Sequence, residues 1–395
     1  MNTLLPRVVF EGIVTVRDRL LQMPDPLRLE SGDPSFDTPD HIKQAAIKAL
    51  GDNATHYAPS AGIKPLKEAI YAKLGNKNRM SYLSSPEQVF VTAGGMHALY
   101  CTFRSILNDG DEVMFQVPNW TATGQIIIAA GGQLNRVKLR PELGYRWDLD
   151  ELESKITPKT RAIAINTPHN PTGGVMFRED LERLLKIAVK HDLYIVSDEA
   201  YEDVIYDTEH VSIASLAGGY PRAVQDKIIT AFTFSKSFAM SGWRLGYAVC
   251  TGEKFSENIK KMILYTANGI STPTQWAGVA ALTGPQDCIT TMRAAYRERR
   301  DLLFAGVNRT DFLRCQVAPQ GAFYVYAQIT DDWKGNARDL SNYLIANFSL
   351  GAIPGDIFYD DTPSIRFAYA CKTEMIKRAI QTLASATMPS TSITP

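Results

Sequence analysis

Short apolar runs alternate with amphipathic stretches through the middle of the chain. Runs with the length and composition of buried strands lie at 89–91, 112–116, 162–165, 194–196, 228–232 and 246–250. Apolar residues recur at helical spacing over 97–107, 178–191 and 253–265. This alternation predicts an α/β fold, with a mostly parallel sheet sandwiched by helices.

The two ends of the chain differ from this middle part. Residues before about 42 are rich in Pro, Asp and Arg and show no strong strand. Beyond 285, the pattern predicts a long charged helix, a strand-turn segment and another helix, over 286–307, 316–328 and 336–349. We therefore expect an N-terminal arm that belongs partly to a smaller α+β domain, a large domain, the smaller domain itself and a Ser/Thr/Pro-rich flexible tail, over 1–41, 42–284, 285–385 and 386–395.

Charge and cysteine content narrow the class of partner. Among the 395 residues, Lys+Arg and Asp+Glu balance at 42 each, so nothing predicts binding to nucleic acid or to an anionic membrane. We expect small-molecule partners and a second copy of the chain. The cysteines are odd in number, scattered and without C-x-x-C pairing, which favours free thiols over zinc or disulfides: Cys101, Cys250, Cys288, Cys315 and Cys371. With no signal-peptide core in 1–10 and no apolar run of membrane-span length, we expect a cytoplasmic location and no metal site.

Residues that could bind a ligand or take part in catalysis follow the predicted strands, where parallel sheets bind their ligands. They are Gly94, Gly95, Trp120, Asn170, Asp198 and Lys236. Partial burial of an ammonium at Lys236 would lower its pKa, and a neutral amine can attack a carbonyl to form a Schiff base. An arbitrary lysine is far more often a surface residue, so this reading depends on its neighbours.

The neighbours of Lys236 indicate that the carbonyl belongs to a phosphorylated cofactor. Gly94 and Gly95 lie between a strand and a helix, where backbone N–H groups can hold an anion. Arg244 could add a guanidinium fork, and Ser235 and Thr233 could add hydroxyls. The spacing matches neither a dinucleotide fingerprint nor a P-loop.

Other residues near the strand ends suit a flat, nitrogen-containing ring, although each has a simpler explanation. Asp198 could keep a ring nitrogen protonated, which makes the ring an electron sink, or it could be a helix N-cap. Tyr201 could donate to a phenolate-like oxygen. Asn170 could be turn chemistry before Pro171, and Trp120 could be core packing instead of a stacking ring.

In this order and spacing, the residues resemble the class I (class I/II) aminotransferases, which are pyridoxal-phosphate enzymes of fold type I. The likeness is greatest to the bacterial aspartate and aromatic aminotransferase subgroup, and it runs from 31–39 to 364–367. The stretch from Ser235-Lys236 to Gly242-Trp243-Arg244-x-Gly246 is the most specific motif. His169-Asn-Pro-Thr-Gly and Ser197-Asp-Glu-x-Tyr support it.

The resemblance implies a role for each residue around the cofactor, pyridoxal 5'-phosphate. Lys236 would be the Schiff-base lysine and proton shuttle, and Asp198 would be the partner of the pyridinium nitrogen. Asn170 and Tyr201 would bind the phenolic oxygen, and Trp120 would stack on the ring. The phosphate would be held by Gly94, Gly95, Thr233, Ser235 and Arg244, and Met96 would also contact the cofactor.

The same resemblance implies how substrate and a second subunit take part. Arg366 would grip the substrate α-carboxylate, with the backbone of Gly32 beside it and with Trp120 and Asn170 also in contact with substrate. Tyr57 would reach the phosphate of the neighbouring subunit, which implies a homodimer with shared active sites.

The expected reaction is ping-pong transamination of an L-amino acid with a 2-oxo acid, which we expect to be 2-oxoglutarate. A carbon–sulfur lyase or a related synthase on the same fold is the alternative. A DNA-binding regulator is disfavoured because the chain reaches Gly32 too early to hold an extra module, and a generic nucleotide-binding protein lacks its phosphate motif. In the N-terminal arm, residues 9–13 depart from the Lys-Pro-Ser-x-Thr type of pattern that the resemblance implies for an aspartate enzyme. Glu11 would repel a second carboxylate if it faced the pocket, so aspartate, aromatic and neutral donors stay open.

Overall fold

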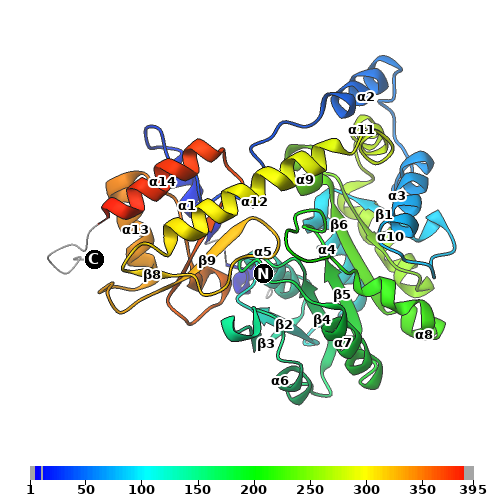
Figure 1. Ribbon diagram of the computed structural model, residues 1–395. Helices are drawn as coiled ribbons and strands as arrows, with labels where there is room; N and C mark the ends of the chain where they lie inside the picture. Colours follow the sequence, from blue (N-terminus) through cyan, green and yellow to red (C-terminus); the bar gives the residue numbers. More distant parts are fainter. Residues whose placement is uncertain (1–4, 10–11, 387–395) are drawn as a thin grey trace.

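A seven-stranded sheet forms the centre of the computed structural model, which describes residues 5–9 and 12–386 (Figure 1). Its strand order is β1-β7-β6-β5-β4-β2-β3. Strand β7 is antiparallel to both of its neighbours, and the other pairs are parallel. The strands are β1 (Val89–Thr92), β2 (Glu112–Val117), β3 (Gln133–Lys138), β4 (Thr160–Asn166), β5 (Tyr194–Asp198), β6 (Ile228–Thr233) and β7 (Gly246–Val249).

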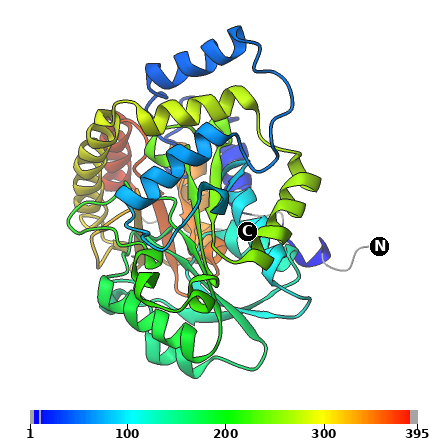
Figure 2. The ribbon, with the colours of Figure 1, turned by 90° about the vertical axis from the view of Figure 1, so that its right-hand side faces the viewer.

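Helices cover both faces of this sheet (Figure 2), because successive residues of each strand point to opposite sides. In β4, Ala162 and Ala164 belong to one buried cluster, whereas Ile163 and Ile165 belong to another. The alanine side packs against α4 (Gly94–Ile106), α5 (Thr121–Ala129) and α10 (Glu253–Ala267). The buried cluster on the isoleucine side also includes residues of α1 (Ile13–Leu20), α2 (Asp40–Gly51), α3 (Lys64–Asn76), α6 (Leu149–Ser154), α7 (Arg178–Lys190) and α11 (Thr272–Thr283). The predicted α/β sandwich is confirmed.

A smaller antiparallel sheet of order β10-β11-β9-β8 has its own buried cluster. Its strands are β8 (Leu313–Arg314), β9 (Tyr324–Ile329), β10 (Ile353–Pro354) and β11 (Ser364–Ala368). The cluster includes residues of α12 (Asp287–Val307), α13 (Ala337–Phe348) and α14 (Thr373–Ser385). Helix α12 reaches from the neighbourhood of α11 to this sheet (Figure 1). The remaining short helices are α8 (Arg222–Gln225) and α9 (Phe234–Ser237).

Most predicted elements agree with the structure to within a few residues, and the differences have local causes. Helix α4 begins at Gly94 instead of residue 97, because both glycines lie inside its first turn. Strand β7 begins at residue 246, as predicted, because Arg244 two residues earlier has a left-handed φ of 54° and cannot be part of a strand. Strand β3 was not predicted, since its sequence QLNRVK lies at the sheet edge and is mostly polar. Glu11 and the tail residues 387–395 lie outside the described part of the chain.

Over the residues that the structure describes, none of the helices is long and apolar enough to cross a membrane.

Candidate active site

The carboxyl ends of the parallel strands bring the predicted residues to one edge of the large sheet. Asp198 is the last residue of β5 and lies opposite Asn166, the last residue of β4. Lys236 lies in α9, directly after β6, and Gly94 begins α4 two residues after β1. The chain thus places a lysine, an acid and a helix N-terminus at the same edge of the sheet, where α/β sheets bind ligands.

Lys236 is held in a partly buried position with its amine bonded to backbone. Its Nζ donates to the carbonyl oxygen of Gly32 at 2.7 Å and lies 5.4 Å from the ring centroid of Phe323. The pKa of Lys236 is lowered to about 8, mainly by burial; the Asp33 carboxylate opposes this shift, and the positive charge of Arg366 adds to it. The neutral amine is therefore far more accessible near neutral pH than in an ordinary lysine.

Asp198 is a buried carboxyl, with 7% of its surface exposed. Burial raises its pKa to about 7, the Glu199 carboxylate adds to the rise, and the hydrogen bond from the amide of Ala200 to Oδ1 at 3.2 Å opposes it. The chain forms a turn after Asp198 instead of a helix, so the N-cap alternative is wrong. A cation next to this carboxyl would favour its ionised form.

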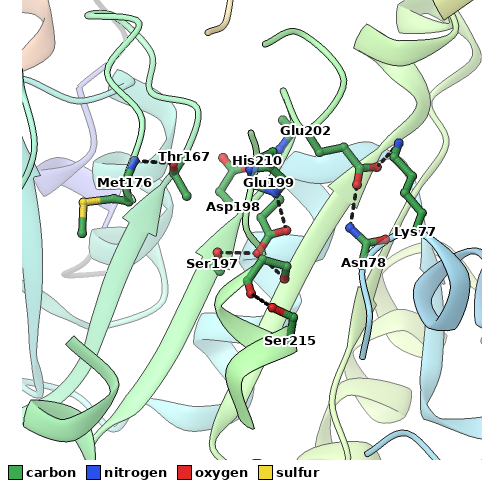
Figure 3. Close-up of polar contacts among 12 residues, drawn as sticks. Lys77, Asn78, Thr167, Met176, Ser197, Asp198, Glu199, Glu202, His210 and Ser215 are labelled. Atoms are coloured by element: carbon green, nitrogen blue, oxygen red, sulfur yellow. Dashed lines mark hydrogen bonds and ion pairs between the residues drawn. The ribbon is translucent and has the colours of Figure 1, made fainter. Parts of the chain in front are cut away.

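A buried polar network fixes the loop that follows Asp198 (Figure 3). Glu199 has no exposed surface. Its Oε1 accepts from the hydroxyls of Ser197 at 3.0 Å and Ser212 at 2.8 Å, and its Oε2 lies 2.9 Å from Nε2 of His210. Because buried carboxylates are stable only when satisfied, this network holds the end of β5 in place. This network was not predicted from the sequence, since its loop partners His210 and Ser212, 11 and 13 residues after Glu199, belong to no motif.

The first turn of α4, a guanidinium and two hydroxyls converge beside this edge. Gly94 has φ +79°, and a Cβ there would lie 2.7 Å from Nη2 of Arg244. A Cβ on Gly95 would lie 3.5 Å from Cβ of Thr233, whose hydroxyl donates to Oγ of Ser235 at 2.8 Å. Helix α4 has no side-chain cap. Its first amides, with this cation and these hydroxyls, form a cradle suited to a phosphate.

Arg366 lies deep in the site with only 1% of its surface exposed. Its Nη1 donates to Oδ1 of Asn170 at 2.9 Å, and its Nη2 donates to the carbonyl of Glu30 at 2.7 Å. Its guanidinium carbon lies 4.4 Å from the ring centroid of Tyr324 and 4.8 Å from that of Phe358. Nε is buried without a partner in the described part of the chain. A buried guanidinium in this state binds a carboxylate favourably.

Tyr201 has a partner that the sequence analysis did not identify. Its hydroxyl lies 2.7 Å from the hydroxyl of Tyr324, and both side chains are buried. Gly32 gives Tyr324 its room, because a Cβ on Gly32 would lie 2.2 Å from the Tyr324 hydroxyl oxygen. The only sequence signal for Tyr324 was its place within the predicted strand-turn segment 316–328.

Other predicted residues lie at the margin of this cluster. Trp120 is partly buried at the N-terminus of α5, and its amide donates to Oδ1 of Asn119 at 2.7 Å. Met96 is 45% exposed in the first turn of α4. Tyr57 is 91% exposed in the loop between α2 and α3, so the described chain does not bring it to the other site residues.

Comparisons with known proteins agree with this geometry over nearly the whole chain. The sequence profile of the family described as aminotransferase class I and II matches residues 24–383. The aspartate/prephenate aminotransferase of Thermus thermophilus is 37% identical over 366 residues, which cover 91% of this chain and 90% of the relative. The aromatic-amino-acid aminotransferase 2 of Thermococcus litoralis is 36% identical over 359 residues, 90% of each chain.

Solved structures give the same result. The aspartate aminotransferase of Thermus thermophilus with maleate superposes with a TM-score of 0.90 at 35% identity, covering 97% of this chain and 98% of that one. The Rhizobium meliloti aspartate aminotransferase gives a TM-score of 0.91 at 28% identity and covers 98% of both chains. The comparisons do not favour the lyase alternative. The chain belongs to the aminotransferase class I and II family, and it is a pyridoxal-phosphate-dependent enzyme that transfers amino groups by transamination.

Proposed function

We propose that this enzyme transfers the amino group of an L-amino acid to 2-oxoglutarate at the edge of the large sheet. The observation that carries the proposal is that a partly buried amine, a buried acid, an uncapped helix N-terminus and a buried guanidinium meet there: Lys236, Asp198, the start of α4 and Arg366. Each group has a counterpart on the cofactor or on an amino acid.

The residues fit pyridoxal phosphate group by group. The cradle of α4, Arg244, Ser235 and Thr233 suits the phosphate, because Gly94 leaves the guanidinium against the helix start where a side chain would exclude it. Asp198 suits the ring nitrogen. The remaining proposed contacts are Gly95 at the phosphate, Met96 beside the cofactor, Trp120 over the ring, and Asn170 and Tyr201 at the phenolic oxygen.

The protein groups divide the work of the reaction. When bound, the cofactor supplies an electron sink for the charge left by the α-proton. Lys236, with its lowered pKa, removes that proton through Nζ and would then return it to a carbon of the cofactor. Arg366 holds the α-carboxylate, with the Gly32 backbone beside it, and so fixes the direction of the α-hydrogen. Asp198 keeps the ring nitrogen protonated through its negative charge.

A panel of amino donors tests the proposal and ranks the substrates. Aspartate and aromatic amino acids are the donors named for the relatives above, so both are proposed here. We expect glutamate to form from 2-oxoglutarate only when a donor is present, and the oxo acid derived from the donor to appear in equal amount. Release of pyruvate and ammonia from a β-substituted donor without any acceptor would contradict transamination.

Replacing Asp198 by Asn is expected to stabilise the cofactor-free protein at alkaline pH. The pKa of Asp198 is raised from 3.8 to about 7, so the folded state binds its proton more tightly than the unfolded chain does. Stability due to this group is therefore lost as the pH rises through that window. Thermal unfolding should show a melting temperature a few degrees above that of the unaltered protein at pH 8. The difference should vanish near pH 4, and a difference that grows on acidification would contradict the burial argument.

We also propose that the enzyme is a homodimer in which Tyr57 reaches the phosphate of the neighbouring site. The support is its 91% exposure, which is unusual for a large aromatic side chain. The five unpaired cysteines support a cytoplasmic location. The division into an arm and a large and a small domain, at 1–41, 42–284 and 285–385, likewise stays a proposal.

Replacing Tyr57 by Phe is expected to weaken cofactor binding about tenfold, because one hydrogen bond to a charged phosphate is lost. The dissociation constant can be measured by fluorescence titration at protein concentrations where sedimentation shows a dimer. Tyr265→Phe is the matched control, since Tyr265 is also highly exposed, at 84%. A protein that sediments as a single chain with full cofactor affinity would contradict the proposal.

A further inference from the structure

Tyr324, at the start of β9, lies between the two halves of the site. On one side its hydroxyl contacts that of Tyr201 at 2.7 Å. On the other side its ring lies against the Arg366 guanidinium, at 4.4 Å from the ring centroid. Neither contact belongs to the motifs that identify the family, yet together they connect the proposed partner of the cofactor oxygen with the proposed carboxylate clamp.

The surroundings allow Tyr324 little freedom to move. It has 2% of its surface exposed, and its ring packs edge-on against Phe323 and Tyr201, with centroids 5.1 Å and 5.9 Å away. The backbone of Gly32 passes so close to its hydroxyl that any side chain there would collide with it. A phenol fixed in this way can hold its neighbour's hydroxyl in one orientation at little entropic cost.

Only one direction of the hydrogen bond lets Tyr201 serve the cofactor. Each phenol carries one proton, so a Tyr201 that donated to Tyr324 would have none left for the cofactor oxygen. Burial raises the pKa of both phenols, and the Arg366 guanidinium, whose central carbon lies 4.4 Å from the Tyr324 ring centroid, opposes that rise in both and so does not select the direction. The direction in which Tyr324 donates and Tyr201 accepts is the one that leaves the Tyr201 proton free for the cofactor.

We propose that Tyr324 is a positioning residue that acts on both sides of the site. Its hydroxyl directs the Tyr201 proton toward the phenolic oxygen of the cofactor, and its ring supports the Arg366 guanidinium. The inference rests on the roles proposed above for Tyr201 and Arg366. The effect of the Tyr324 hydroxyl and the effect of its ring can be tested separately, because Phe at this position removes only the hydroxyl whereas Leu also removes the ring.

The hydroxyl is tested by titrating the visible absorbance of the cofactor-loaded enzyme against pH. A hydrogen bond donated to the phenolic oxygen lowers the pKa of the adjacent Lys236 nitrogen. Tyr324→Phe should therefore raise the titration midpoint, by about half a pH unit, and Tyr201→Phe should raise it by about one unit or more. The double variant should match Tyr201→Phe alone, as expected for groups that act in series. Tyr206→Phe is the control and should leave the midpoint unchanged, since its buried hydroxyl donates to the carbonyl of Ala322.

The ring is tested by the Michaelis constant for the amino donor. Tyr324→Phe should leave KM within about twofold, whereas Tyr324→Leu should raise it about tenfold, as expected for loss of a buried cation–π contact. Should Tyr324→Leu fail to fold, the absorbance titration of Tyr324→Phe still decides the inference. If Tyr201→Phe shifts the midpoint and Tyr324→Phe does not, this inference is wrong and the proposed site stands. If neither variant shifts it, the role proposed for Tyr201 fails first.

Discussion

Replacing Lys236 by Ala is expected to lower kcat by at least about four orders of magnitude, since one change removes both a nucleophile and a proton-transfer group. The side chain carries the only amine that the described site residues place at this strand edge. Its pKa of about 8 makes its neutral form available near neutral pH. Initial rates with the best donor of the panel give kcat, and the visible absorbance of the purified protein reports the bond between lysine and cofactor, which should be absent.

The matched control is Lys236→Arg, which keeps a positive charge and a donor for the carbonyl of Gly32 but cannot supply a neutral amine. It should be as inactive as Lys236→Ala while retaining the thermal stability of the unaltered protein. Added methylamine should restore part of the lost rate in Lys236→Ala, where a small amine has room to act. Turnover by Lys236→Ala together with the unaltered absorbance would remove Lys236 from the mechanism.

Periodicity and short motifs were sufficient to predict the fold class and the strand ends around this lysine. Apolar runs such as 228–232 and 194–196 are local signals, because a buried parallel strand needs a continuous apolar segment. The residues after them were then placed together by a general property of such sheets. The comparisons with known proteins confirm the family and its cofactor, whereas the roles of individual residues stay predictions.

Contacts between distant segments could not be predicted in this way. Tyr324 and Tyr201 are 123 residues apart, and they meet because the segment at the start of β9 lies against the loop that follows β5. His210 and Glu199 are only 11 residues apart, yet their contact belongs to no motif and follows from how the loop after β5 packs. A single sequence carries no record of which buried polar groups satisfy one another, since hydrogen-bond partners follow from packing and not from spacing. The proposed contact of Tyr57 lies in a second chain, so packing within one chain does not determine it.

Replacing Arg366 by Gln is expected to lower kcat/KM for amino donors by about a thousandfold, because two charge-assisted hydrogen bonds to the α-carboxylate are lost. Most of the loss should appear in KM, since the clamp binds the substrate before and during proton removal alike. Steady-state rates over a range of donor concentrations separate the two constants. Arg366→Lys should recover little, because an ammonium cannot form the same fork and Asn170 would lose its planar donor.

The control for this second prediction is Arg299→Gln. Arg299 is also a buried arginine, 6% exposed, which lies 4.9 Å from the ring centroid of Phe36 and donates to the carbonyl of Ala370. Its loss should lower the melting temperature but leave KM for the donor nearly unchanged, so that a general effect of removing a buried guanidinium can be subtracted. A second control changes the substrate instead of the enzyme, by replacing the α-carboxylate of the donor with a neutral amide. The unaltered enzyme should react more slowly with this amide donor, and Arg366→Gln should lower that rate little further. If the amide donor and the amino acid fell equally on substitution of Arg366, the guanidinium would be acting on the fold and not on the carboxylate.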